Sequence, residues 1–597
     1  MADNRMIGRE PVVGIRPVID ARQGKIDVRG QLEEQTMELA QKAAHLIRTE
    51  LKYTSGVPVK VLVAERTIGR VSEAAACQEE FHRQGVEITL TVSPCWCYGT
   101  ETMDMDSQTI KGVWGFNGTE RPGAVYLAAV MAAHAQKGLP AFSIYGQEVQ
   151  DADDREIPED VKKKILRFVR AAVAVASMKG KSYLQIGASC MGISGSQIEY
   201  DFFESYLGMR VESVDEVEVL RRLREGIYDK DEVSKALAWT RENCREGFDK
   251  NPEIYQRTRE EKDKDWDFSV KTMCIIKDLM NGNSDLPDEF PEEKLGYNAI
   301  AAGFQGQRQW TDHYPNTDFA EALLNSSFDW NGVREPYILA TENDSLNGAA
   351  MLCNKLLSGR AQMFSDVRTY WSAASVERVT GYKLEGLAGR AGGIIHLINS
   401  GASCLDMCGA LKDENGNAVV KRFYEMQQDD IHKCLEKTDW CPADLGYFRG
   451  GGFSSRFVTE SEMPVTMTRI NLIRGLGPVM QIAEGYTVVL PEEVSCILWD
   501  RTDPTWPCTW FVPKLTGKGA FQTVYDVMDK WGANHGAISY GHIGADVITL
   551  CSILRIPVCM HNVDEKDIFR PACWEAFGMD KESQDYRACA VYGPRYR

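Results

Sequence analysis

The first 180 residues alternate short apolar segments with longer amphipathic ones, and this alternation constrains the fold more than any other feature. The short segments, rich in β-branched residues, are residues 12–19, 59–64, 86–92 and 140–145. The longer segments, with apolar residues at helical spacing, are residues 32–51, 71–83, 122–137 and 158–178. Strands that alternate with helices form βαβ units, in which each helix connects two parallel strands. The pattern therefore predicts a parallel α/β sheet.

A second alternating unit begins after the sequence KGKS at residues 179–182. Its strand-like segments are residues 183–187 and 337–341, and its helix-like segments are residues 217–249, 252–281 and 345–357. We expect this unit to form a second parallel sheet covered by helices.

The pattern changes near residue 360, where strand-like segments separated by glycine and proline begin to predominate. They are residues 363–370, 393–398, 465–473, 486–490 and 509–512, and helix-like segments return at 521–531 and 545–555. Such strands are typical of antiparallel barrels. We therefore predict an α/β protein with two Rossmann-like α/β domains, residues 1–180 and 181–358, and a β-rich, barrel-like C-terminal domain, residues 359–597.

The charge balance excludes some partners. The 68 Lys and Arg residues stand against 86 Asp and Glu residues, a formal net charge of −18. Nucleic-acid binding and membrane-surface binding both need a basic surface, so neither is expected. The longest apolar runs, residues 124–135 and 171–178, are shorter than the roughly 18–20 residues that span a bilayer.

The 17 cysteines bear on the compartment. Most lie in apolar segments, and the first 17 residues lack the apolar stretch of a secretory signal. The close pairs Cys95/Cys97 and Cys404/Cys408 have no second pair with which to form a zinc site. We expect reduced thiols and a cytoplasmic location.

No nucleotide motif is complete in the sequence. Residues 516–519 (TGKG) lack the first glycine of a P-loop and its final Ser or Thr. Residues 449–453 (RGGGF) lack the GxGxxG spacing, and residues 192–196 (GISGS) lack the spacing of a nucleophile elbow. We therefore expect no nucleotide cofactor.

Three segments carry chemistry-bearing residues: 341–345 (TENDS), 365–371 (SDVRTYW) and 531–536 (WGANHG). The first lies where a predicted strand ends and a helix begins, which is where open α/β sheets bind ligands. Two carboxylates with one imidazole suit a divalent ion such as Mn²⁺ better than zinc or copper.

Structural roles also explain these residues. Glu342 or Asp344 can cap the helix that follows, and Asp366 can pair with Arg368. His535 can be a structural histidine in a glycine-rich turn. His542 and His561 are rival ligands, and the spacing of residues 535 and 542 does not match a helical histidine pair.

The chain resembles the L-fucose isomerase family over nearly its whole length. The segments that carry the resemblance are 14–20 (GIRPVID), 94–99 (PCWCYG), 115–123 (GFNGTERPG), 299–308 (AIAAGFQGQR), 340–348 (ATENDSLNG), 448–452 (FRGGG), 531–536 (WGANHG) and 556–562 (IPVCMHN). The resemblance implies a Mn²⁺-dependent aldose–ketose isomerase that interconverts L-fucose and L-fuculose, and also D-arabinose and D-ribulose, through an enediol. It also implies a homohexamer, in which the N-terminal domain of one subunit helps to close a neighbour's site.

The resemblance assigns roles to particular residues of this sequence. Glu342, Asp366 and His535 match the family's metal ligands, and Glu342 and Asp366 also match its proton-transfer carboxylates. Five further residues match substrate-contacting positions: Arg16, Trp96, Gln305, Tyr447 and Asn534. These residue types suit the reaction, because a metal stabilises enediolate charge and two carboxylates can move the proton.

Two other functions stay open at this point. One is a different metal-dependent sugar isomerase, such as an arabinose isomerase, with the same chemistry and another substrate pocket. The other is a non-catalytic sugar-binding protein, since two Rossmann-like domains also occur in sugar receptors. Such a receptor would need neither the Glu/Asp/His set nor a β-rich third domain.

Overall fold

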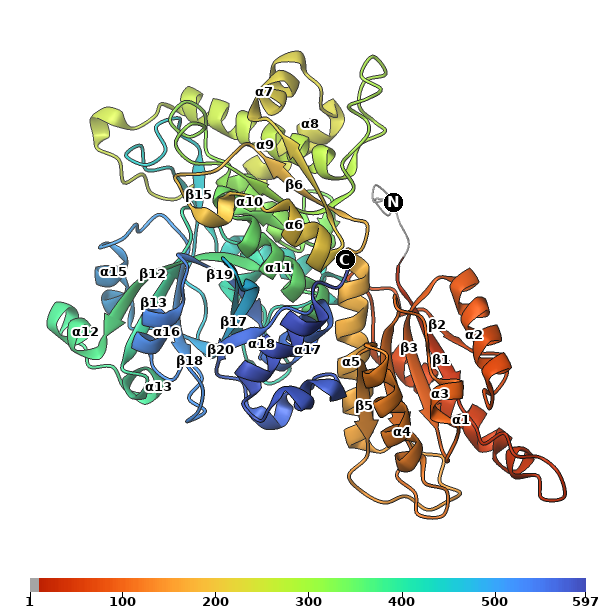
Figure 1. Cartoon of the computed structure of the whole chain (residues 1–597). Helices are drawn as coiled ribbons and strands as arrows, with labels where there is room; N and C mark the ends of the chain where they lie inside the picture. Colours follow the sequence, from red (N-terminus) through yellow and green to blue (C-terminus); the bar gives the residue numbers. More distant parts are fainter. Residues whose placement is uncertain (1–9) are drawn as a thin grey trace. The chain divides into compact units, whose positions relative to one another are not determined.

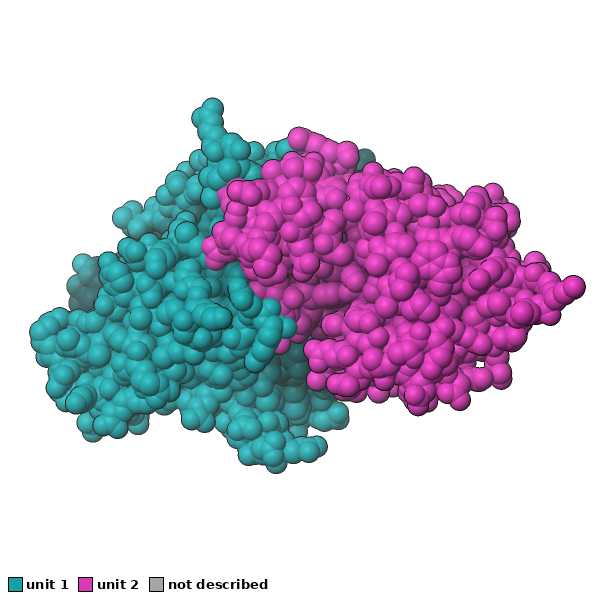
Figure 2. Space-filling view, turned by 60° about the horizontal axis from the view of Figure 1, so that its bottom comes forward, with its two compact units in different colours: residues 1–8, 180–544, 558–566 teal, residues 9–179, 545–557, 567–597 magenta. Residues whose placement is uncertain are grey.

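A computed structural model describes residues 10–597, which fold into two compact units. Of the described residues, unit 1 contains 180–544 and 558–566, and unit 2 contains the remaining segments, 10–179, 545–557 and 567–597; Figure 2 colours them teal and magenta. The division into three domains stays a prediction. Within residues 10–597, no helix has the length and apolar character needed to cross a membrane.

Unit 2 is built around a five-stranded parallel sheet in the order β2-β1-β3-β4-β5 (Figure 1). Its strands are β1 (Val12–Pro17), β2 (Val61–Val63), β3 (Val86–Ser93), β4 (Ile110–Gly115) and β5 (Ala141–Tyr145). Its main helices are α1 (Val28–Glu50), α2 (Val71–Gln84), α4 (Gly123–Gln136), α5 (Glu159–Met178) and the C-terminal α18 (Lys581–Tyr592). Val13, Ile15 and Leu90 are fully buried, as expected for parallel strands covered on both faces. The parallel α/β prediction is confirmed, although β4 was not predicted.

Unit 1 begins with a four-stranded parallel sheet in the order β11-β8-β6-β7. Its strands are β6 (Ser182–Ile186), β7 (Arg210–Val214), β8 (Ala299–Phe304) and β11 (Leu339–Ala340). The helices of this region are α7 (Glu216–Glu225), α8 (Lys230–Asn243), α9 (Arg259–Asn281), α10 (Asp318–Asn325) and α11 (Ser345–Ser358).

Two helices expected here were wrong in extent. The segment 217–249 is not one helix, because Gly226 adopts a left-handed conformation (φ 71°) that ends α7, and Asp229 caps a separate α8. The segment 252–281 becomes α-helical only at Arg259, where Thr258 and Glu261 form a capping box.

The rest of unit 1 contains a β-barrel. Its strands are β12 (Met363–Ser372), β13 (Gly393–Ile398), β16 (Pro464–Ile473), β17 (Gly477–Val488), β18 (Cys508–Pro513) and β19 (His535–Tyr540), and β20 (Val558–His561) adds a parallel edge strand. The ladder runs β16-β19-β12-β13-β18-β17, and β16 also pairs with β17. That last pairing closes six antiparallel strands into a ring. The prediction of a barrel-like C-terminal region is confirmed.

Candidate active site

Glu342 lies in a strained turn between β11 and α11. Both Glu342 and Asn343 have φ near 55°, a left-handed conformation that costs a non-glycine residue about 1–2 kcal/mol. The Asn343 amide donates a hydrogen bond to the Ala188 carbonyl (3.0 Å) and so ties the turn to the segment after β6. Asp344 ends the turn by capping α11, where its carboxylate accepts from the Asn347 N–H. The strained backbone is therefore held in place by a contact from outside the turn, as is typical of functional sites.

Asp366 and His535 are brought together by the barrel. They are directly opposite residues in the antiparallel β12–β19 ladder, so their side chains lie on the same face. Asp366 Oδ1 lies 3.1 Å from His535 Nε2, and Glu342 Oε2 lies 3.3 Å from the same nitrogen. The three residues expected to bind metal therefore meet at one atom.

His535 is fully buried, and its second ring nitrogen is also engaged. Nδ1 lies 2.7 Å from Asp344 Oδ2, which is 2.6 Å from the Arg469 guanidinium. Burial alone would lower the pKa of His535, but hydrogen bonds to Asp344, Asp366 and Glu342 raise it well above its usual value. Burial likewise opposes the charge on Asp344, yet Arg469 and His535 hold its pKa well below the usual range.

The donor set fits a divalent cation. Two ligands at right angles, each about 2.2 Å from an ion, are about 3.1 Å apart, close to the two Nε2–oxygen distances here. Among residues 10–597, no group of three or more His, Cys, Asp or Glu side chains is arranged to hold a metal ion as it stands; Glu342 and Asp366 each contact the His535 ring nitrogen directly. A cation bound by Nε2 and the two carboxylates would compete with a proton on Nε2.

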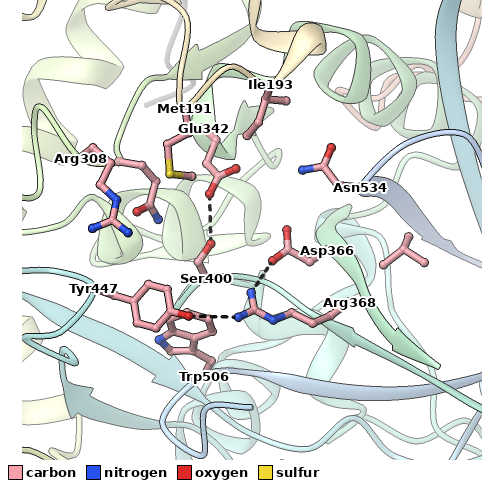
Figure 3. Close-up of a pocket in the computed structure, with 12 residues that line it drawn as sticks. Met191, Ile193, Arg308, Glu342, Asp366, Arg368, Ser400, Tyr447, Trp506 and Asn534 are labelled. Carbon is pink, nitrogen blue, oxygen red and sulfur yellow. Dashed lines mark hydrogen bonds and ion pairs between the residues drawn. The ribbon is translucent and has the colours of Figure 1, made fainter. Parts of the chain in front are cut away.

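Glu342 and Asp366 face a cavity of about 400 Å³ (Figure 3). Its lining residues are Met191, Ile193, Gln307, Arg308, Glu342, Asp366, Val367, Arg368, Ser400, Tyr447, Trp506 and Asn534. The Ser400 hydroxyl is 3.4 Å from Glu342 Oε1. The Arg368 guanidinium donates to Asp366 Oδ2 (3.2 Å) and lies over the Trp506 ring, 5.3 Å from its centroid. A cavity of this size, with convergent polar groups and an aromatic wall, suits a small polar ligand.

Comparison with known proteins identifies the family. Family models described as the first N-terminal, second N-terminal and C-terminal domains of L-fucose isomerase match residues 10–180, 181–359 and 397–561. The curated L-fucose isomerase of Bacteroides thetaiotaomicron is 63% identical over 98% of this chain and 99% of its own length. Those of Escherichia coli (strain SMS-3-5) and Vibrio vulnificus are 59% and 58% identical over the same shares. The chain belongs to the L-fucose isomerase family.

For this member of the L-fucose isomerase family, the structure groups five of the eight predicted site residues. Glu342, Asp366, Tyr447 and Asn534 line the cavity, and His535 lies directly behind its two carboxylates.

Gln305 does not line the cavity. Its side-chain oxygen accepts from the Ala188 N–H (2.9 Å), and its amide contacts Gln309. Its neighbours Gln307 and Arg308 line the cavity instead. A substrate contact for Gln305 stays a prediction.

Arg16 and Trp96 belong to unit 2. Arg16 is 3% exposed and donates to Thr91 Oγ1 (3.0 Å) and to the Thr102 carbonyl (2.8 Å). Trp96 is 37% exposed. Their substrate contacts also stay predictions.

The alternative readings are settled in part. Asp344, not Glu342, caps α11. Asp366 does pair with Arg368, but through Oδ2, while Oδ1 faces His535. His542 bonds to the Gly485 carbonyl, and neither His542 nor His561 lines the cavity.

Several lining residues were missed from the sequence. Arg308 and Arg368 carried a signal, because each lies inside a segment already singled out. Ser400 lies two residues beyond the end of the buried strand β13. Met191 and Trp506 carried no local signal, since folding alone brings them to the cavity.

Proposed function

We propose that this protein is a metal-dependent aldose–ketose isomerase that interconverts L-fucose and L-fuculose through an enediol, and also acts on D-arabinose and D-ribulose. Glu342, Asp366 and His535 would hold Mn²⁺. One observation carries the proposal: two carboxylates from separate elements converge on one imidazole nitrogen at a cavity of sugar size. The names of the curated relatives support the substrate.

The reaction moves a carbonyl between C1 and C2, so a proton must leave C2 and another must reach C1. Glu342 and Asp366 supply two carboxylates to the same cavity from different directions, one from the β11–α11 turn and one from β12. One carboxylate can therefore accept the proton while the other assists transfer at the neighbouring oxygen. The bound ion would supply Lewis-acid stabilisation of the developing negative charge.

The other lining groups position the sugar and the carboxylates. Arg368 fixes Asp366 by its hydrogen bond to Oδ2, which leaves Oδ1 directed toward His535. Tyr447 and Trp506 pack edge to face and present an aromatic surface, which can cover the apolar side of a sugar. Asn534 offers an amide beside His535, with its nitrogen 3.0 Å from Nε2.

The deciding experiment measures colorimetric ketose formation from L-fucose with Mn²⁺ and with EDTA-treated protein. A metal-dependent L-fucose isomerase forms ketose only with the metal. Metal-dependent turnover of L-arabinose with none of L-fucose would indicate an arabinose isomerase. Absence of turnover with retained sugar binding would indicate a non-catalytic sugar-binding protein.

We further propose a homohexamer located in the cytoplasm, with sites shared between subunits. In that assembly Arg16 and Trp96 would act from the N-terminal domain of a neighbouring subunit, as the resemblance to the family implies. Most of the 17 free cysteines are buried, which fits a reducing compartment. Light scattering coupled to size-exclusion chromatography tests the assembly, because a monomeric mass would contradict it.

A further inference from the structure

Asp344 is a buried carboxylate that the proposed reaction does not use. It has no solvent exposure and does not line the cavity, so it cannot touch a sugar bound there. Its Oδ1 accepts from the Asn347 N–H (3.1 Å) at the start of α11. Its Oδ2 lies 2.7 Å from His535 Nδ1 and 2.6 Å from Arg469 Nη1. A helix cap needs only one oxygen, so the second has another role.

The second oxygen acts on the orientation of the imidazole. A neutral imidazole carries its proton on one nitrogen, and a carboxylate beside Nδ1 keeps the proton there. The lone pair is then on Nε2, the nitrogen that faces Glu342 and Asp366. The ring of Phe364, with its centroid 4.7 Å from that of His535, packs against the imidazole.

We propose that Asp344 is a positioning residue that locks His535 with Nε2 presented as a metal ligand, and that Arg469 and Gly195 hold Asp344 in place. The inference rests on the proposed function, since it assigns a role toward the same ion. Arg469 is itself 3% exposed and is oriented further by Asn471, whose side-chain oxygen accepts from its Nε (3.2 Å).

Gly195 closes the other side of the Asp344 carboxylate. A Cβ at this position would stand 2.1 Å from Asp344 Oδ1, 2.7 Å from its Cγ and 2.8 Å from Arg469 Nη2. A glycine is therefore required at position 195, because the Asp344 carboxylate approaches its backbone too closely to leave room for a Cβ atom. It also offers a way to displace Asp344 without changing any charge.

The test measures Mn²⁺ binding by the complete protein, which is first stripped with EDTA. The signal of free Mn²⁺ in electron paramagnetic resonance gives the dissociation constant. Asp344→Asn keeps the size of the side chain and its ability to cap α11, because Asn caps helices as well as Asp. It loses the charge that anchors His535 and Arg469. We expect the dissociation constant to rise about 10–100-fold, the usual effect of removing such a partner of a metal-binding histidine.

Gly195→Ala is the second variant, and we expect it to weaken Mn²⁺ binding in the same direction. Glu484→Gln is the matched control: Glu484 is 3% exposed, pairs with Lys514 at 3.0 Å and lines no part of the cavity. Its Mn²⁺ affinity should equal that of the unmodified protein, even where its melting temperature falls.

The outcomes separate the proposed binding of Mn²⁺ from the proposed positioning role of Asp344. If the unmodified protein does not bind Mn²⁺, the metal part of the proposed function is wrong. If it binds Mn²⁺ and both Asp344→Asn and Gly195→Ala bind as tightly, Asp344 only caps α11 and the inference is overturned. An equal loss of affinity in Glu484→Gln would also overturn it. Should Asp344→Asn fail to fold, Gly195→Ala decides alone.

Discussion

Gly303 offers a test of how the fold supports Glu342. The residue lies in β8, outside the cavity lining, and a Cβ there would stand 2.4 Å from Asn343 Oδ1. It would also stand 2.8 Å from the Tyr183 hydroxyl and 3.1 Å from Asn343 Cα. The substitution Gly303→Ala therefore presses on the left-handed turn that carries Glu342.

The expected cost follows from those distances. Forcing a methyl group into such a packed site costs about 1–3 kcal/mol. If the Asn343 amide moves away, it also loses its hydrogen bond to the Ala188 carbonyl, worth about 1 kcal/mol. The sum of about 2–4 kcal/mol corresponds to a fall in Tm of about 3–5 °C for a unit as large as unit 1. Because a shift of 1 Å in a catalytic group can cost about 100-fold in rate, we expect kcat to fall about 10–100-fold.

The assay measures ketose formation from L-fucose at saturating Mn²⁺, together with a thermal melt. Gly146→Ala in unit 2 is the control, since its added methyl would meet only the Val161 Cγ2 atom within 3.4 Å, at 3.3 Å. We expect near-normal kcat and Tm for that control. A Gly303→Ala protein with unchanged kcat and Tm would refute the claim that β8 supports the Glu342 turn.

Three further predictions follow from the site and its surroundings. Glu342→Gln and Asp366→Asn should each lower kcat by at least about 10²–10⁴-fold at saturating Mn²⁺, because the isosteric amide cannot transfer the proton; near-normal turnover of L-fucose would leave that residue a structural role. The ratio of kcat/KM for L-fucose over D-arabinose should stay within about 10–200-fold, because the sugars differ by one methyl-bearing carbon beyond the reacting end; good turnover of L-fucose with none of D-arabinose would contradict this. Burial, with a smaller effect of Asp215, raises the pKa of Glu216 to about 7, so ionisation between about pH 4.5 and 7 destabilises the folded protein. The Glu216→Gln protein should therefore be more stable than the unmodified protein at pH 8 but not at pH 5. The gain should be about 1–2 kcal/mol after allowance for partial exposure. Thermal melts at both pH values test this, because an equal Tm difference at pH 8 and pH 5 would be inconsistent with the raised pKa.

The local sequence pattern was sufficient to predict where the turn that holds Glu342 lies in the chain. The end of β11 and the start of α11 follow from an apolar run, a polar TENDS segment and a helical period, all within some twenty residues. It could not show which acid caps the helix, because Glu342 and Asp344 both stand near its start. The left-handed backbone at Glu342 and Asn343 decides this, and such strain has no signature in residue type.

The strand β4 was missed for a physical reason. Its sequence IKGVWG contains two glycines and a lysine, which are depleted in strands. Gly112 is required because the Phe168 ring packs where its Cβ would be, at 2.7 Å. Lys111 is buried because it donates to the Thr109 carbonyl and hydroxyl at the start of the strand. Both residues are explained by tertiary contacts that lie outside any local window.

The meeting of Asp366 with His535 was also beyond local pattern, since it depends on which distant strands pair. The physical argument from residue types suggested a site, and the resemblance to the L-fucose isomerase family named its members. The ladder then supplied the geometry, by placing the two residues opposite each other.

The closed ring of six strands makes the proposed metal ligands Asp366 and His535 an indicator of correct folding. A slip of one residue between β12 and β19 would turn Asp366 to the opposite face of the sheet. Because β16 pairs with both β19 and β17, such a slip would have to be matched around the whole ring. A chain trapped in the wrong register would keep nearly the same circular dichroism spectrum. It would nevertheless lose the proposed cation site. Binding of the ion would thus report that β12 and β19 have paired in the correct register.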